Sequence, residues 1–128
     1  MLEMAIKYTD SGLWIEQVGE NYRIGLSVKG QDDAGEVMFI ELPNFSDKLE
    51  IGETLIGVEG AKAVTEIVAP ISGKIEQVHT ELEDDYSLLN SKNSEENWIV
   101  ELSDVLGANS AEFSDDPWFG QTPSEDEE

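Results

Sequence analysis

The segment GVEGAKAVTEIVAPISG, residues 57–73, predicts a β-hairpin with a lysine at its turn. Segments 54–59 and 64–69 are rich in the β-branched and small apolar residues of paired strands. Residues 60–63, Gly-Ala-Lys-Ala, are enough for a tight connection between them. A proline and a Ser-Gly pair follow the second strand and favour a corner. We therefore expect two antiparallel strands that present Lys62 to solvent.

Short strands separated by turn residues continue on both sides of this hairpin. Further strands are expected at 13–18, 22–27, 36–42, 74–79 and 98–102. The first two flank Gly19-Glu20-Asn21 and should form another hairpin. Residues 28–34 predict a short helix or turn that ends at Gly35, and residues 81–97 an acidic loop with a helical turn. The pattern predicts a mostly β domain with short helices.

A length of 128 residues suits one domain. We place this domain at residues 1–103 and an acidic, partly mobile tail at residues 104–128. The tail segment carries eight acidic residues, has no Lys or Arg, and ends in SEDEE. Within it, Trp118 and Phe119 are expected to pack back on the domain rather than bind a partner.

The charge of the chain limits its partners. There are 29 Asp and Glu against seven Lys and Arg, a net charge of −22. Such a surface repels phosphates, so we expect no nucleic acid and no anionic membrane among its partners. A protein partner should offer a basic face, and strong self-repulsion favours a monomer. The N-terminus lacks the apolar core of a signal peptide and no apolar run approaches a membrane span, so we expect a cytoplasmic protein.

The residues for catalysis are largely missing. The chain has no cysteine, and its one histidine, His79, is expected to be a strand-end or surface residue without a nucleophile beside it. The acidic pairs Asp32-Asp33 and Asp84-Asp85 lack the spacing of a calcium loop, and no glycine-rich phosphate motif occurs. We therefore expect no metal site and no enzymatic activity of the chain itself.

Lys62 is the candidate for covalent modification. An exposed lysine, with a pKa near 10.4, is a poor nucleophile by itself, so a modifying enzyme would have to activate it. A hairpin supplies access and a rigid base, and Ala61 and Ala63 leave the amine clear. Acylation would remove the charge and turn the side chain into a tether for a cofactor. The alternative is a lysine that only aids solubility, and the spacing alone leaves both open.

Residues 59–62, Glu-Gly-Ala-Lys, followed by Ala-Pro-Ile-Ser-Gly at 69–73, resemble the lipoyl attachment hairpin of glycine cleavage system H proteins. Biotin acceptors, which use a similar corner, have Met on both sides of the lysine, and phosphocarriers need a His pair. Segments 7–15 and 25–43 also follow the H-protein pattern. The resemblance covers roughly residues 7–102.

This resemblance implies a barrel-sandwich hybrid of two small antiparallel sheets. It further implies that lipoate is amide-linked to Lys62 and works as a swinging arm, carrying electrons or a substrate group between enzymes. The neighbours that would shape the platform and guide the lipoate-attaching enzyme are Glu59, Gly60, Ala61 and Ala63.

Some segments point to a particular branch of the family. Gly12-Leu13 stands where H proteins usually have His-Glu, and the long helical C-terminal ending is missing. Segments 31–35 and 89–102 resemble an H-like branch linked to a macrodomain protein and a sirtuin-type ADP-ribosyltransferase in oxidative stress. That likeness implies Asp32 as an acceptor of ADP-ribose, with Asp33 as second choice. The alternatives are a glycine cleavage H protein that shuttles the aminomethyl group and an unmodified acidic protein-binding module.

Overall fold

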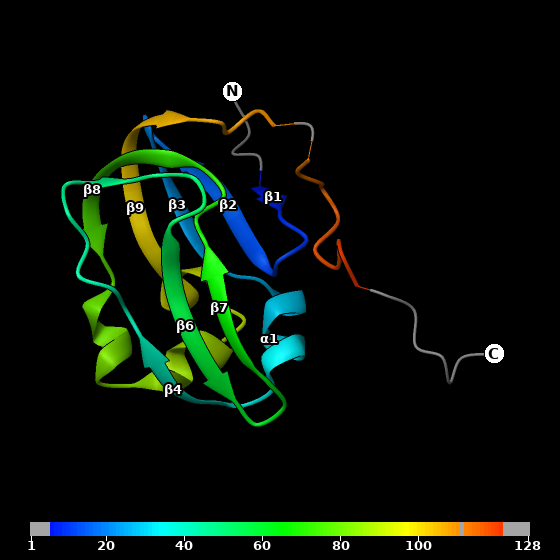
Figure 1. The fold of residues 1–128 in the computed structure, drawn as a ribbon. Coiled ribbons are helices and arrows are strands. Elements are labelled where there is room, and N and C mark those ends of the chain that lie inside the picture. The colour runs from blue at the N-terminus through cyan, green and yellow to red at the C-terminus, as the bar shows by residue number, and fades with distance from the viewer. Residues whose placement is uncertain (1–5, 111, 122–128) are drawn as a thin grey trace.

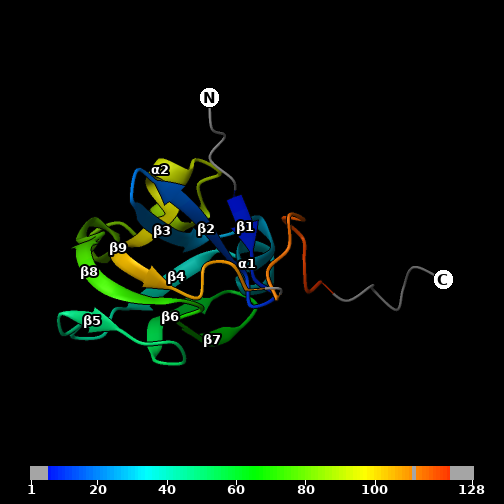
Figure 2. The same ribbon diagram turned by 90° about the horizontal axis from the view of Figure 1, so that it is seen from above.

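The computed structural model describes residues 6–110 and 112–121. In this part of the chain two antiparallel sheets lie one above the other (Figures 1 and 2). The larger sheet contains, in spatial order, β1 (Ile6–Tyr8), β2 (Leu13–Val18), β3 (Asn21–Leu26), β9 (Trp98–Leu106), β8 (Ser72–Val78) and β5 (Lys48–Leu49). The smaller sheet contains β4 (Val37–Glu41), β6 (Thr54–Gly60) and β7 (Val64–Val68).

Short helices connect the strands. They are α1 (Val28–Ala34), the 3₁₀ turns η1 (Thr80–Glu83) and η2 (Tyr86–Asn90), and α2 (Ser94–Asn97). Alternating apolar residues of both sheets fill the space between them, including the fully buried Leu13, Ile24, Leu55 and Ile99. The structure confirms the predicted mostly β fold of two antiparallel sheets.

The local signals placed several elements correctly. β2 and β3 form the expected hairpin, with Gly19 at a φ of 63° in the turn. β6 and β7 form the lysine-bearing hairpin, in which Glu59 lies opposite Val64. α1 ends at Gly35, whose φ of 76° suits the end of a helix.

The structure differs from the expectation in two places. Residues 48–49, which were not predicted to be a strand, form β5 and pair with β8. The strand that begins at Trp98 continues to Leu106, because its partner β8 extends the ladder to the pair Ser72 and Leu106. The predicted domain boundary at residue 103 therefore falls inside a strand, and the division of the chain at that point stays a prediction.

Segment 81–97 is more ordered than a loop. Its turns bury Leu82 and Leu89 completely. His79 is also buried, and its ring stacks on Trp98 with centroids 4.4 Å apart. The expectation of a surface or strand-end histidine was therefore wrong about its exposure, because a strand-end residue far along the chain from its partners carries no local sign of burial.

The segment after β9 runs beside β1. Tyr8 and Ser114 exchange backbone hydrogen bonds, and Lys7 forms an ion pair with Asp115. Phe119 is partly buried near the turn between β1 and β2, whereas Trp118 stays 40% exposed. None of the helices in the described part of the chain has the length and apolar character needed to cross a bilayer.

Candidate functional site

Lys62 lies in the turn between β6 and β7, at the end of the molecule beside α1 (Figure 1). The amide of Gly60 donates to the carbonyl oxygen of Ala63 at 2.9 Å and closes the turn. The Lys62 side chain is 62% exposed. The structure thus places the predicted lysine where it was expected, with its amine open to solvent.

The backbone of the turn is fixed by the segment that follows α1. The amide of Lys62 donates to the carbonyl oxygen of Ala34, and the amide of Ala61 to that of Glu36, both at 2.9 Å. These partners lie far along the chain, so the hairpin tip is anchored to a second element rather than standing alone. The side chain of Lys62 is exposed to solvent, and the point from which it extends is held by these hydrogen bonds.

Gly60 is required for this contact. A Cβ atom there would lie 2.1 Å from the carbonyl oxygen of Ala34, which is far inside van der Waals contact. The φ of Gly60 is not positive, so the need for glycine comes from the close approach of α1 and not from strain in the turn. Gly35 is favoured for a different reason, its φ of 76°, although a Cβ there would also lie 3.0 Å from Cγ of Lys62.

A second set of polar contacts holds the segment to which the hairpin is anchored. Asn90 accepts from the Val37 amide at 2.8 Å and donates to the Gly35 carbonyl oxygen at 3.3 Å. The buried side chain of Gln31 donates to the carbonyl oxygens of Leu89 and Ser91. Sequence reasoning missed Asn90, because the groups that it binds are more than fifty residues away and no local pattern marks it.

The electrostatic neighbour of Lys62 is Asp32, on α1. Lys62 Nζ lies 3.7 Å from Asp32 Oδ1 and donates to the Asp32 carbonyl oxygen at 3.2 Å. Both side chains are more than half exposed, so water screens this pair and its contribution is small. Asp33 instead pairs with Lys29 at 2.7 Å. The structure therefore brings Asp32, but not Asp33, to the predicted attachment lysine.

The other residues of the motif surround the turn. Glu59 and Ala61 are exposed and Ala63 is half-buried, so small or flexible groups border the amine. Leu13, where the family more often has Glu, is fully buried in the core and offers no carboxylate. Among residues 6–110 and 112–121, no cluster of His, Cys, Asp or Glu has the arrangement of a metal site.

These features fit a lysine that an enzyme acylates. The amine is accessible, and two backbone hydrogen bonds fix the turn that bears it. Breaking the weak ion pair with Asp32 costs little free energy. An acyl group attached to this amine would extend outward from the end of the hairpin into solvent. Among the ionisable side chains of the described residues, the Asp32 carboxylate is the one paired with the amine, and an exposed lysine on a fixed turn suits a tether.

Comparison with known proteins identifies relatives over most of the chain. The family model Glycine cleavage H-protein matches residues 6–114. The chain is 38% identical over 102 residues to the glycine cleavage system H protein of Vibrio atlanticus, a match that covers 79% of this chain and 81% of the relative. It is 37% identical over 102 residues to that of Halalkalibacterium halodurans, covering 78% and 80%.

A solved structure supports the fold. The crystal structure of a glycine cleavage system H protein from Mycobacterium marinum superposes with a TM-score of 0.66 at 24% sequence identity, covering 84% of this chain and 93% of that chain. H proteins carry lipoate covalently on a lysine and act as lipoyl carriers rather than catalysts. The family match and the curated relatives together show that this chain belongs to the glycine cleavage H-protein family.

Proposed function

We propose that Lys62 carries lipoate in amide linkage and that the chain shuttles the aminomethyl group between the enzymes of glycine cleavage. The supporting observation is the exposed amine at a turn whose backbone is fixed to the end of α1. Family membership supports the same role, because the relatives are glycine cleavage H proteins. The expected partners are the glycine cleavage components and a lipoate-attaching enzyme.

The dithiolane of bound lipoate would supply the redox and group-carrying chemistry, and this chain would position it. The Lys62 amide and its acceptor, the Ala34 carbonyl oxygen, hold the base of the arm. Gly60 lets the hairpin approach α1, and Ala61 and Ala63 leave space around the acyl group. A fixed base keeps the effective concentration of the arm at its partners high.

Mass spectrometry of the native protein tests the attachment. A lipoyl adduct located at Lys62 by fragmentation is expected, and Lys62→Arg should lack it while keeping the same fold. The aminomethyl role is tested by adding the lipoylated protein to glycine decarboxylase and aminomethyltransferase, where glycine turnover should depend on it. Native protein without any adduct would instead support the unmodified acidic binding module.

The position of Asp32 supports a second candidate function. This half-exposed carboxylate lies 3.7 Å from the Lys62 amine. We propose, as the alternative role, an H-like carrier whose Asp32 accepts ADP-ribose, with a sirtuin-type ADP-ribosyltransferase and a macrodomain protein as partners. Acylation of Lys62 removes the cation beside Asp32 and leaves that carboxylate unpaired.

Incubating the lipoylated chain with NAD and a sirtuin-type ADP-ribosyltransferase distinguishes this second role from the aminomethyl carrier. An adduct lost in Asp32→Asn and kept in Asp33→Asn would support it. Asp33 is the matched control because it lies on the same helix and is also exposed, but pairs with Lys29 instead. Glycine turnover without any ADP-ribosyl adduct would favour the aminomethyl carrier alone.

A further inference from the structure

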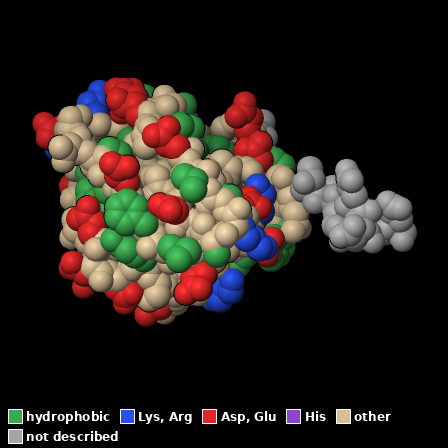
Figure 3. All heavy atoms as spheres, turned by 60° about the horizontal axis from the view of Figure 1, so that its bottom comes forward, with side chains coloured by type: hydrophobic (Ala, Val, Ile, Leu, Met, Phe, Trp, Pro, Cys, Tyr) green, Lys and Arg blue, Asp and Glu red, His purple; other side chains and the backbone are tan. Residues whose placement is uncertain are grey.

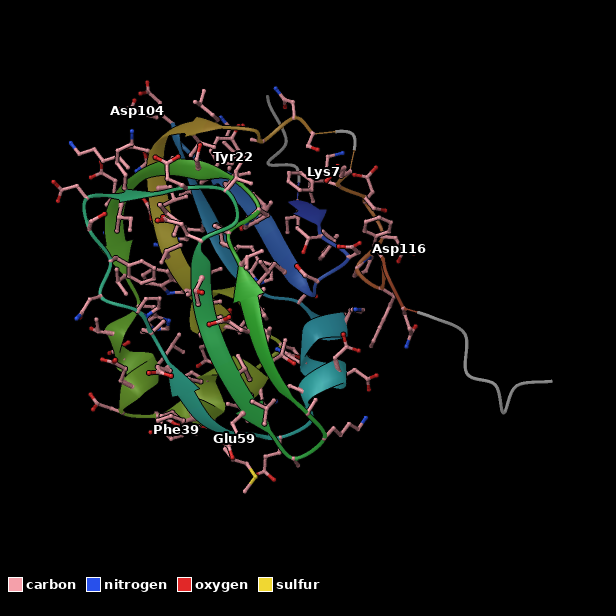
Figure 4. All side chains as sticks on the ribbon, viewed as in Figure 1. Lys7, Tyr22, Phe39, Glu59, Asp104 and Asp116 are labelled. Atoms are coloured by element: carbon pink, nitrogen blue, oxygen red, sulfur yellow. The ribbon has the colours of Figure 1, made fainter. Side chains whose placement is uncertain are left out.

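The outer face of the smaller sheet carries a groove next to the Lys62 hairpin. Two rows of paired residues cross this face, Phe39–Glu59–Val64 and Glu41–Gly57–Glu66. Gly57, in the central strand, has no side chain and leaves a groove that the residues of both rows line. Phe39 and Glu59 lie near the end of the molecule that bears the hairpin turn (Figure 4).

The apolar part of the groove is exposed yet ordered. Phe39 is 48% and Val64 78% exposed, so both present apolar surface to an incoming partner. The ring of Phe39 packs edge-on against Tyr86, with centroids 5.6 Å apart and planes at 77°. This contact holds the ring in place, so an incoming group would meet a preformed wall.

The rest of the lining is acidic. Within the described residues, Glu41, Glu59 and Glu66 form no ion pair with a Lys, Arg or His side chain. Apolar and acidic side chains are mixed over this end of the molecule, and its Lys and Arg side chains lie toward the margins (Figure 3). A groove with apolar walls and carboxylates at its edge complements a side chain with a hydrocarbon stem and a cationic head.

We propose that this groove is the docking site by which the lipoate-attaching enzyme recognises the chain, and that it receives an Arg or Lys side chain of that enzyme. The stem would lie over Gly57, beside the apolar side chains of Phe39 and Val64 in the neighbouring row, and the head would pair with Glu41 and Glu66, which flank Gly57. This inference rests on the proposed attachment at Lys62.

The position of the groove favours the attaching enzyme, rather than the other partners, as the protein that binds there. The reacting group of a loaded arm is at its far end, whereas the amine that the attaching enzyme acylates is at its base. The attaching enzyme must bring its acyl donor to the amine itself. It therefore has to cover the pair Glu59 and Val64, which is the last pair of β6 and β7 before the turn.

The test measures lipoylation of the full-length apo chain by a bacterial lipoate–protein ligase with lipoate and ATP, followed by intact mass. Gly57→Val places a side chain in the groove, where its Cβ meets only Glu41 atoms at 3.7 and 3.8 Å, and a urea titration checks that the variant is folded. Gln77→Val, an exposed position on β8, is the matched control. Glu41→Gln/Glu66→Gln removes the charge without changing shape.

Gly57→Val is expected to lower kcat/KM for lipoylation about tenfold, mainly through KM, while Gln77→Val stays near the parent value. Glu41→Gln/Glu66→Gln should lower it as well and flatten its dependence on salt. Parent-like rates for both groove variants overturn the docking site, as does a loss confined to the use of the loaded arm. If the parent chain itself receives no lipoate at Lys62, the attachment proposal is the one that fails.

Discussion

The amine of Lys62 lies 3.7 Å from a carboxylate oxygen of Asp32, so the lysine of the hairpin turn pairs with the helix that also anchors the turn. The two residues are thirty positions apart in sequence. Their side chains are exposed, and the backbone contacts beside them carry most of the attachment of the hairpin to α1. The backbone hydrogen bonds therefore hold the turn in place, whereas the ion pair only sets the charge beside the amine.

Asp32→Asn should have little effect on stability, because the ion pair that it removes is on the surface. We expect the free energy of unfolding to change by less than about 1 kcal/mol, measured by urea titration at low salt. Lipoylation should proceed at least as fast as in the parent, since the amine is released from its partner. A change of several kcal/mol would contradict the screened pair described above.

Gly60→Ala should be much more damaging than Gly57→Ala, although both glycines lie in β6. The new Cβ at position 60 meets the Ala34 carbonyl oxygen at 2.1 Å, whereas at position 57 it makes only ordinary contacts. We expect a loss of about 1–3 kcal/mol in the first variant and little change or slight stabilisation in the second. Equal urea midpoints for the two variants would be inconsistent with the close approach of α1.

Asn90→Ala should loosen the base of the arm without touching Lys62. It removes the acceptor of the Val37 amide and should cost about 1–3 kcal/mol. Hydrogen exchange of the Ala61 and Lys62 amides should speed up, because the segment that accepts their hydrogen bonds is less well held. The exposed Asn109 provides the control, and Asn109→Ala is expected to leave both measurements unchanged.

Glu101 should make stability fall at acidic pH. Burial raises the pKa of Glu101, but hydrogen bonds from Asn21 and Arg23 and the charge of Arg23 outweigh it and hold the pKa below its ordinary value of 4.5. The ionised form thus stabilises the folded state above about pH 4.5, and this contribution is lost as the pH falls through the lower folded value.

Glu101→Gln is the variant that tests this. Between pH 4.5 and more acidic values its free energy of unfolding should vary less than that of the parent, and at pH 7 it should be lower by about 1–3 kcal/mol. Glu81→Gln, at a largely exposed carboxylate, is the comparison. Identical pH profiles for parent and Glu101→Gln would rule out the contribution assigned to Glu101.

Elements that depend on neighbouring residues could be predicted from the sequence. Alternating apolar residues around short turns predicted the hairpin of β6 and β7, and Gly35 predicted the end of α1. The motif at 59–62 also predicted Lys62 as the attachment lysine, and the structure places that residue in an exposed turn. Strand period, turn residues and helix ends are local properties, so they are visible in a single chain.

The distant residues that support the site became apparent from the folded structure. The bonds from Asn90 to residues 35 and 37, the contact of Gly60 with Ala34, and the pair of Lys62 with Asp32 all join segments far apart in sequence. The groove over Gly57 likewise needs the register of three strands. Such contacts follow from how the sheets and α1 pack, and packing between distant segments leaves no periodic signal in the chain.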